Sequence, residues 1–233
     1  MLKGGEKMKI KLALKQLDYF SDEAYKKLRT NIQLCGGNKK VIAFTSSIPN
    51  EGKSSVSLNL ALSMAEAGKG TLFIDADLRK SVLKARVRVK DKVDGLTNYL
   101  TEQAEIKEII YSTEFPELDI IFSGPVPPNP AELLGGEMFQ ELVHQVRKEY
   151  DYVIIDTPPL GSVIDCAVIA KECDGAVLVI ESDKISYKFA QEVKEQLEKT
   201  GCPILGAILN KVDMTQNKYY VQYKEYQHKV SRK

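Results

Sequence analysis

The stretch TSSIPNEGKSS, residues 45–55, lies between an apolar run and a helical pattern. It matches the P-loop pattern G-x-x-x-x-G-K-[ST] at Gly52, Lys53 and Ser54, whereas Ser47 replaces the leading glycine. In such a loop, backbone N–H groups curl around phosphate oxygens at a helix N-terminus, whose dipole favours negative charge. A polar strand-to-helix turn is the alternative, because G-K-S alone is common. The strand–loop–helix context favours a phosphate site.

The residues of this loop have distinct expected roles. Gly52 lets the backbone approach the ligand, Lys53 reaches the β- and γ-phosphates, and the Ser54 hydroxyl ligates Mg²⁺. The expected cofactors are therefore ATP and Mg²⁺. The residues expected to contact the nucleotide in this loop are Pro49, Asn50, Glu51, Gly52, Lys53, Ser54 and Ser55.

Six apolar runs rich in Val and Ile predict strands that are hydrophobic on both faces, as in a parallel sheet covered by helices. They span residues 40–46, 71–77, 118–123, 152–156, 176–181 and 204–210. Helical patterns cover residues 21–34, 54–67, 137–149 and 185–200, and a short helix opens at Asn129-Pro130. This alternation predicts an α/β fold of the P-loop NTPase class, a doubly wound, mostly parallel sheet flanked by helices.

Composition and charge exclude several classes of protein. The chain has 233 residues, 43% hydrophobic and 28% charged, which is typical of a globular protein, and its net charge is +1. No apolar run is long enough for a membrane span or a signal peptide, so a cytoplasmic location is expected. The four cysteines lack zinc-ligand spacing. With balanced charge and no basic–aromatic patch outside the C-terminal tail, no nucleic-acid partner is expected.

Carboxylates stand at the ends of two predicted strands. LFIDADLRK, residues 72–80, delivers Asp75 and Asp77, two residues apart and so on one side of a strand. They could act at the ligand site at the carboxyl edge of the sheet, or only cap the next helix. Arg79 could bind phosphate or a surface acid. Asp156 ends YDYVIID as in a Walker B strand, where it would hold Mg²⁺ directly or through water, or serve as a helix cap.

Asn210 ends the last predicted strand in GAILNKVD, residues 206–213. Its side-chain amide could read the edge of a nucleotide base, and a turn-forming asparagine is the alternative. The similar N-K-x-D of GTPases keeps GTP open, so these residues do not establish adenine preference.

Together these motifs resemble the bacterial tyrosine kinases of the CpsD/CapB type, P-loop proteins that govern capsular and exopolysaccharide synthesis. The resemblance runs from about Asp18 to the end of the chain. The stretches that carry it are EAYKKLRTNI (23–32), SSIPNEGKSS (46–55), FIDADLRK (73–80), SGPVPPNPAELL (123–134), YDYVIIDTPP (150–159) and the tyrosine-rich tail.

The resemblance implies an ATP-dependent protein-tyrosine kinase. It assigns catalysis to Lys53, Asp75 and Asp77, and metal binding to Ser54, Asp75 and Asp156. One carboxylate of the Asp75/Asp77 pair accepts the proton of the attacking tyrosine, and Asp75 is preferred by analogy. Positioning and charge neutralisation would do most of the catalytic work.

The C-terminal tail is expected to supply the acceptors. Residues 1–213 would form the kinase domain, with an oligomerisation helix at about 18–35, and residues 214–233 a flexible tail. The tail holds four of the eleven tyrosines, and five basic residues against one acidic residue. A helical docking stripe is the alternative. The resemblance makes the autophosphorylation cluster Tyr219, Tyr220, Tyr223 and Tyr226.

The N-terminal helix resembles the family's oligomerisation motif Glu-x-x-Arg-x-x-Arg, here Glu23, Lys26 and Arg29. A spacing of three places these residues near one helix face. Lysine at position 26 lacks the bidentate fork of arginine, and a solvated charged helix is the alternative. The resemblance implies a ring-like homo-oligomer, with an octamer as one expected size. It also implies a transmembrane adaptor that recruits the kinase to the inner face of the membrane, and a cognate tyrosine phosphatase.

Two other functions remain open. A partitioning ATPase of the MinD/ParA type would carry a lysine five residues before Lys53, but Ile48 stands there. A nucleotide-binding scaffold without kinase activity is the second alternative, although every catalytic residue type is present.

Overall fold

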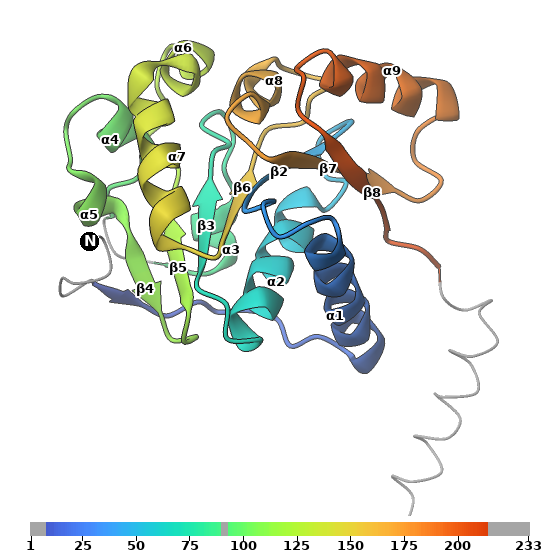
Figure 1. The fold of residues 1–233 in the computed structure, drawn as a ribbon, viewed down its shortest axis with the longest axis horizontal. Coiled ribbons are helices and arrows are strands. Elements are labelled where there is room, and N and C mark those ends of the chain that lie inside the picture. The colour runs from blue at the N-terminus through green and yellow to red at the C-terminus, as the bar shows by residue number, and fades with distance from the viewer. Residues whose placement is uncertain (1–7, 90–92, 214–233) are drawn as a thin grey trace, which may run out of the picture.

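The computed structural model describes residues 8–89 and 93–213, which form a three-layered α/β fold with helices on both faces of a sheet (Figure 1). In this part of the chain the sheet has eight strands in the order β1-β4-β5-β3-β6-β2-β7-β8. Neighbouring strands are parallel except β4 and β5. The predicted fold class is confirmed. The strands are β1 Lys9–Ile10, β2 Val41–Ser46, β3 Thr71–Asp75, β4 Tyr111–Thr113, β5 Leu118–Ile121, β6 Tyr152–Asp156, β7 Gly175–Glu181 and β8 Ile204–Asn210.

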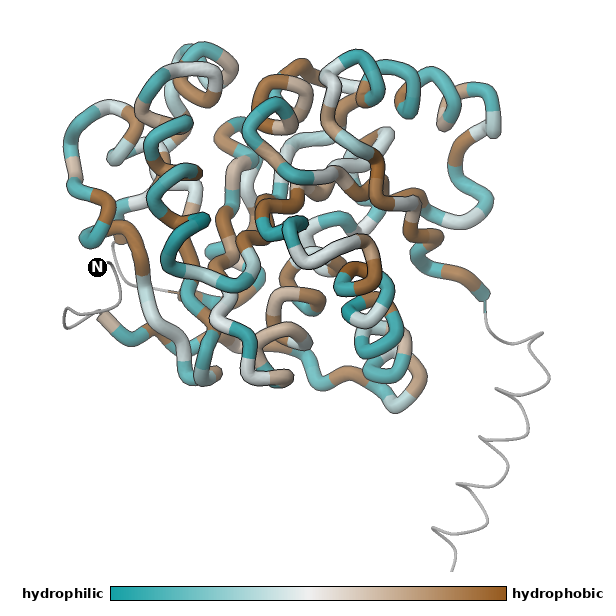
Figure 2. Tube along the Cα trace, in the orientation of Figure 1, coloured by the Kyte–Doolittle hydropathy of each residue, from teal (hydrophilic) through white to brown (hydrophobic). Residues whose placement is uncertain are grey.

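Two apolar cores lie on opposite faces of the sheet, because successive strand residues point to opposite sides. In β2, Val41 and Ala43 join one core, and Ile42 and Phe44 join the other. Figure 2 shows the hydrophobic stretches concentrated in the strands and hydrophilic stretches along the outer helices. The helices are α1 Tyr19–Leu34, α2 Lys53–Glu66, α3 Leu83–Arg86, α4 Leu96–Leu100, α5 Ile106–Ile109, α6 Pro130–Gly135, α7 Glu137–Glu149, α8 Asp165–Ala170 and α9 Tyr187–Glu198.

The first three helices cover one face of the sheet, and the other six contribute to the core on the opposite face. Helix α2 is central to its layer, with Leu60, Ala61 and Met64 fully buried against the strands. It ends before Gly68, which adopts φ of 74° and gives the predicted C-terminal stop. Among the described residues, no helix combines the length and the apolarity that a bilayer span requires.

The prediction that every strand is buried on both faces is wrong for β8. Gly206 and Ala207 are exposed, and 59% of Leu209 is accessible. The reason is that β8 is the last strand of the sheet order and, among the described elements, packs mainly against β7 and not beneath a helix.

Several short elements are absent from the sequence prediction. Strands β1 and β4 have two and three residues, and α3, α4, α5 and α8 have four to six. Such elements are shorter than the window in which a hydrophobic period can be recognised. Helix α3 matters for the site, because it follows the Asp75–Ser81 segment directly.

Candidate functional site

The P-loop connects β2 to α2 with two residues in left-handed backbone conformation. Asn50 has φ of 70° and Gly52 has φ of 89°. A Cβ added at Gly52 would lie 2.1 Å from Nδ2 of Asn210. Glycine at position 52 is therefore required both by the backbone and by the close approach of β8.

Glu51 stabilises this loop from inside. Its buried carboxylate accepts hydrogen bonds from the N–H groups of Ser47 at 2.6 Å, Ile48 at 2.9 Å and Glu181 at 3.1 Å. The side chain predicted to contact nucleotide thus satisfies backbone donors of the loop itself and of β7. The carboxylate of Glu51 is therefore engaged within the protein.

The end of β8 supports the loop from the outside. Nδ2 of Asn210 donates to the Glu51 carbonyl oxygen at 2.9 Å. Nζ of Lys211 donates to the Asn50 carbonyl oxygen at 2.7 Å and pairs with Glu181 at 3.0 Å. The structure therefore gives Asn210 a supporting role, and reading of a base by this residue stays a prediction.

Lys53 and Asp156 form the centre of the site. Nζ of Lys53 lies 2.7 Å from Oδ1 of Asp156, with 6% and 2% of the two side chains exposed. Nζ also lies 3.2 Å from the Ser54 hydroxyl. Ser57, one turn along α2, donates to the same Asp156 oxygen at 3.0 Å. The first strand–helix unit and the β6 carboxylate are thus joined through buried polar contacts.

Asp75 lies beside Asp156, because the two residues are partners in the β3–β6 register. The Ser81 hydroxyl donates to its carboxylate. Burial, followed by the Asp156 charge, raises the pKa of Asp75 to about 7, against weaker opposing effects of Ser81 and Lys53. A carboxylate with a pKa near neutrality can take up and release a proton at physiological pH.

Asp77 and Arg79 make their contacts outside the Lys53–Asp156 centre. Oδ1 of Asp77 accepts from the N–H groups of Arg79 at 3.3 Å and Lys80 at 3.0 Å, which shapes the turn after β3. Arg79 forms a two-pronged ion pair with buried Asp165, at 2.7 and 2.9 Å. The acid partner expected for Arg79 is therefore present, but it is buried in α8 and not on the surface.

The donor set suits Mg²⁺ bound together with a phosphate ligand. Mg²⁺ prefers oxygen ligands and commonly takes one or two carboxylates, with phosphate and water completing its shell. The Ser54 hydroxyl, Asp75 and Asp156 lie around Lys53. Because two buried carboxylates face a single lysine, a bound cation would balance the remaining negative charge. The described residues contain no group of three or more His, Cys, Asp or Glu side chains that would hold a metal by themselves.

Comparison with known proteins agrees with this geometry. The AAA domain family matches residues 39–201. The tyrosine-protein kinase CpsD of Streptococcus agalactiae is 45% identical over 193 residues, which cover 83% of this chain and 84% of the relative. This chain belongs to the bacterial tyrosine kinases of the CpsD/CapB type. The tyrosine-protein kinase YwqD of Bacillus subtilis is 36% identical over 91% of this chain and 90% of its own length.

Solved structures support the same family. The kinase domain of the Escherichia coli tyrosine kinase ETK superposes with a TM-score of 0.77 at 34% identity, covering 82% of this chain and 75% of the other. The chimerical protein CapA2B2 gives 0.78 at 34% identity, with 82% and 84% covered. Pyrococcus horikoshii MinD, at 24% identity and a TM-score of 0.64 with 79% and 76% covered, shares the fold.

The predicted oligomerisation residues of this kinase lie on α1. Lys26 pairs with Asp22 at 2.7 Å and with Glu23 at 2.8 Å, and these side chains are more than two-fifths exposed. Nη1 of Arg29 instead donates to the carbonyl and hydroxyl oxygens of Ser63 at 2.6 and 3.0 Å. Arg29 thus connects α1 to α2 by hydrogen bonds within one chain, whereas the side chains of Glu23 and Lys26 are accessible to solvent. The predicted autophosphorylation residues Tyr219, Tyr220, Tyr223 and Tyr226 lie outside the described residues.

Sequence reasoning missed four residues that contact the predicted site residues or Arg79: Ser57, Ser81, Arg86 and Asp165. Only Ser57 carried a usable signal, because it lies four residues after Lys53 and therefore on the same face of α2. The other three come from a loop and two short helices, and the fold brings Ser81 to Asp75, Asp165 to Arg79 and Arg86 to Ser55. Among them, Nη1 of Arg86 donates to the Ser55 hydroxyl at 2.6 Å.

Proposed function

We propose that this kinase transfers the γ-phosphoryl group of ATP to tyrosine hydroxyls, with Asp75 as the proton acceptor. The observation that supports the proposal most directly is the buried Asp75–Asp156 pair beside Lys53. Its raised pKa lets Asp75 accept a proton near neutral pH, whereas an isolated exposed aspartate is too weak a base. Asp77 is the alternative base, since it lies two residues further along the same segment.

Mg²⁺-ATP, when bound, supplies the phosphoryl group and a cation that screens its charge. Lys53 would bind the β- and γ-phosphates. The Ser54 hydroxyl and Asp156 are the proposed metal ligands, and Asp75 lies close by. Ser57 holds the Asp156 carboxylate in place by its hydrogen bond. These residues neutralise and orient the transferring group, which is where catalysis of phosphoryl transfer lies.

The acceptor tyrosine is proposed to enter from the β3–β5 side. A cleft of about 600 Å³ opens there, with Asp77, Ser81, Ser123 and Val126 among its lining residues. Asn210 lies at the opposite side, on β8, and strands β6, β2 and β7 separate the two. A nucleotide whose base lay toward β8 would present its γ-phosphoryl group toward the cleft, where an acceptor hydroxyl could approach it.

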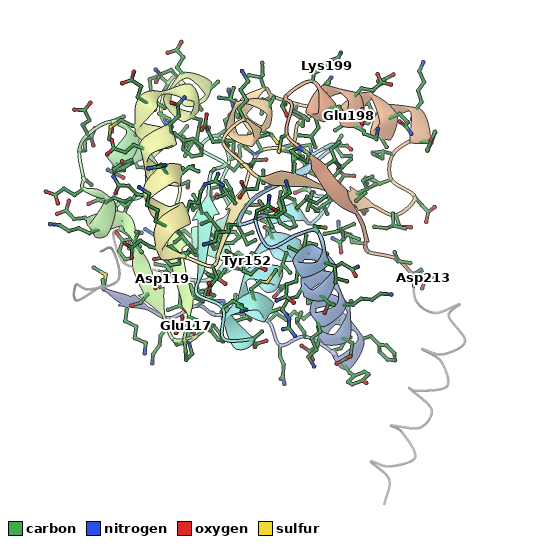
Figure 3. All side chains as sticks on the ribbon, viewed as in Figure 1. Glu117, Asp119, Tyr152, Glu198, Lys199 and Asp213 are labelled. Atoms are coloured by element: carbon green, nitrogen blue, oxygen red, sulfur yellow. The ribbon has the colours of Figure 1, made fainter. Side chains whose placement is uncertain are left out.

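The proposed acceptors are the tail tyrosines of a neighbouring subunit in a ring-like homo-oligomer. The described chain ends at Asp213, which Figure 3 shows beyond the end of β8 and outside the body of the fold. Each phosphotyrosine would add about −1.5 to −2 charges, so phosphorylation of all four tyrosines would reverse the positive balance of the tail. We propose that this change regulates capsular or exopolysaccharide synthesis and export. A transmembrane adaptor would recruit the kinase to the membrane, and a tyrosine phosphatase would reset it.

Incubation with Mg²⁺-ATP followed by phosphosite mapping tests the proposal. We expect phosphotyrosine within residues 219–226, none in Lys53→Met, and none after deletion of residues 214–233. The deleted chain should still bind ATP and should phosphorylate the tail of a Lys53→Met subunit added to it. Absence of phosphotyrosine in the wild-type chain, even with an adaptor peptide present, would exclude the kinase function.

A switch ATPase is the alternative that the shared fold leaves open. The absence of a lysine at Ile48 argues against it, because that class supplies this lysine to the neighbouring site. ATP hydrolysis that depends on dimerisation and leaves no phosphotyrosine would favour the switch. Bound nucleotide with neither reaction would favour a scaffold.

A further inference from the structure

Arg86 extends from the short helix α3 to the first turn of α2. Its Nη1 atom lies 2.6 Å from the Ser55 hydroxyl oxygen. Ser55 directly follows the P-loop Gly52-Lys53-Ser54 triplet, and its N–H bonds to the Gly52 carbonyl at 3.0 Å. A guanidinium group from a separate segment therefore lies against the helix end that binds phosphate.

The position of Arg86 is fixed by its neighbours. Leu83 and Val87, on either side of it, are buried in the same core as α2. The backbone N–H of Arg86 bonds to Val82 at 2.9 Å, and that of Val87 bonds to Leu83 at 2.9 Å. The side chain is exposed while its backbone is anchored, so it can reorient toward a ligand at little cost.

Three other cations in or beside the site have anionic partners. Lys53 pairs with Asp156, Arg79 with Asp165 and Lys211 with Glu181. Within residues 8–89 and 93–213, the contact found for Arg86 is the neutral Ser55 hydroxyl. It uses one of five N–H donors, so most of the guanidinium and its whole charge remain available to a phosphate.

We propose that Arg86 binds the α-phosphate of the nucleotide. In a P-loop the lysine serves the β- and γ-phosphates, and the backbone of the loop and the first helical turn cradles the α- and β-phosphates. Ser55 lies two residues beyond Lys53 in that turn, so the guanidinium lies beside the helical part of the cradle. Arg86 is therefore a nucleotide-binding residue that serves ADP and ATP alike. The inference rests on the proposed nucleotide site but not on any phosphoryl transfer.

Equilibrium binding of ADP and ATP carrying a fluorescent ribose label, each with Mg²⁺, tests this assignment. We expect Arg86→Gln to weaken both nucleotides about tenfold or more and by similar factors, because both carry the α-phosphate. Arg86→Lys should recover part of the affinity, since it keeps charge but loses the fork. Arg88→Gln is the matched control: it is an exposed arginine two residues away, and the same replacement there should change affinity less than twofold.

Three results would overturn the inference. Affinity of Arg86→Gln for ADP within twofold of the wild type would show that the guanidinium does not bind a shared phosphate. If Arg86→Gln lost affinity for ATP but not for ADP, the guanidinium would instead bind the γ-phosphate. Failure of the wild-type chain to bind either nucleotide would remove the nucleotide site itself, and with it the proposed kinase. If the wild-type chain binds both nucleotides but forms no phosphotyrosine, the kinase proposal is excluded and the assignment of Arg86 is unaffected.

Discussion

Nζ of Lys53 lies 2.7 Å from Oδ1 of Asp156, and both side chains are almost fully buried. This contact connects the P-loop on α2 with the carboxyl end of β6. A second carboxylate, Asp75, lies next to Asp156 in the sheet, so one buried lysine faces two buried acids. Burial, followed by the Asp156 charge, raises the pKa of Asp75, and the excess of acids over lysine suits a ligand that brings a metal cation.

Replacing Lys53 with Met should abolish phosphotransfer and also destabilise the fold, because Asp156 would be left buried without its cation. Breaking a buried ion pair from one side costs about 3–5 kcal/mol. The double variant Lys53→Met/Asp156→Asn should recover much of that stability without recovering activity. Urea denaturation with a phosphotyrosine assay measures both quantities. Equal stability of the single and double variants would contradict the buried pair.

The raised pKa of Asp75 predicts how stability depends on pH. Between pH 4 and pH 7 the folded state keeps a proton on Asp75 that the unfolded chain has released, so unfolding free energy falls as pH rises through this range. Asp75→Asn has no such proton to release, so it avoids this loss of unfolding free energy, which is on the order of a few kcal/mol above pH 7. Thermal melts from pH 4 to 8 measure this effect. The melting temperature of the variant should rise relative to that of the wild type up to about pH 7, and above that pH the difference between the two should stay constant. Parallel melting curves would disprove the shift. The same variant should lose phosphotransfer, because it lacks the proton acceptor.

Gly52→Ala should disrupt the P-loop. The new methyl group would meet Asn210 at 2.1 Å and would sit on a backbone with φ of 89°. We expect nucleotide affinity to fall at least tenfold. Adding Asn210→Ala should relieve the contact but not the backbone strain, so recovery should be partial. Full recovery would show that the contact alone matters.

Asn210→Ala alone separates two roles for this residue. Loss of its 2.9 Å bond to the Glu51 carbonyl should cost about 0.5–1.5 kcal/mol of stability. If Asn210 only supports the loop, ATP and GTP should weaken by equal factors. A change in the ATP-to-GTP affinity ratio would show that it also reads the base.

Variants on α1 distinguish assembly from packing. Arg29→Ala removes two hydrogen bonds to Ser63 and should lower the stability of a single chain by about 1–3 kcal/mol. Glu23→Ala with Lys26→Ala removes exposed charges and should leave that stability within about 0.5 kcal/mol. In the proposed ring, the double variant should shift the mass measured by light scattering toward the monomer. An unchanged mass would exclude these residues from the assembly contact.

The amino-acid sequence determined the six longer strands, the central helices and the P-loop. These features depend on local properties: runs of Val and Ile long enough to form strands, and a Gly-Lys-Ser triplet between a strand and a helix. It also placed Asp75 and Asp156 at strand ends, which parallel strands bring to one edge of a sheet. The short elements β1, β4, α3, α4, α5 and α8 escaped prediction, because they carry no measurable period.

Only the tertiary structure decided how the residues at that edge are used. Asn210 meets Gly52 across 158 positions of sequence because β8 runs beside β7, and Glu51 turns inward because three N–H groups need an acceptor. Arg86 reaches Ser55 because α3 packs into the core of α2. The pKa of Asp75 follows from burial beside a second acid, a property of the packed sheet and not of the residue. Local patterns specify elements, whereas long-range packing sets distances and charges.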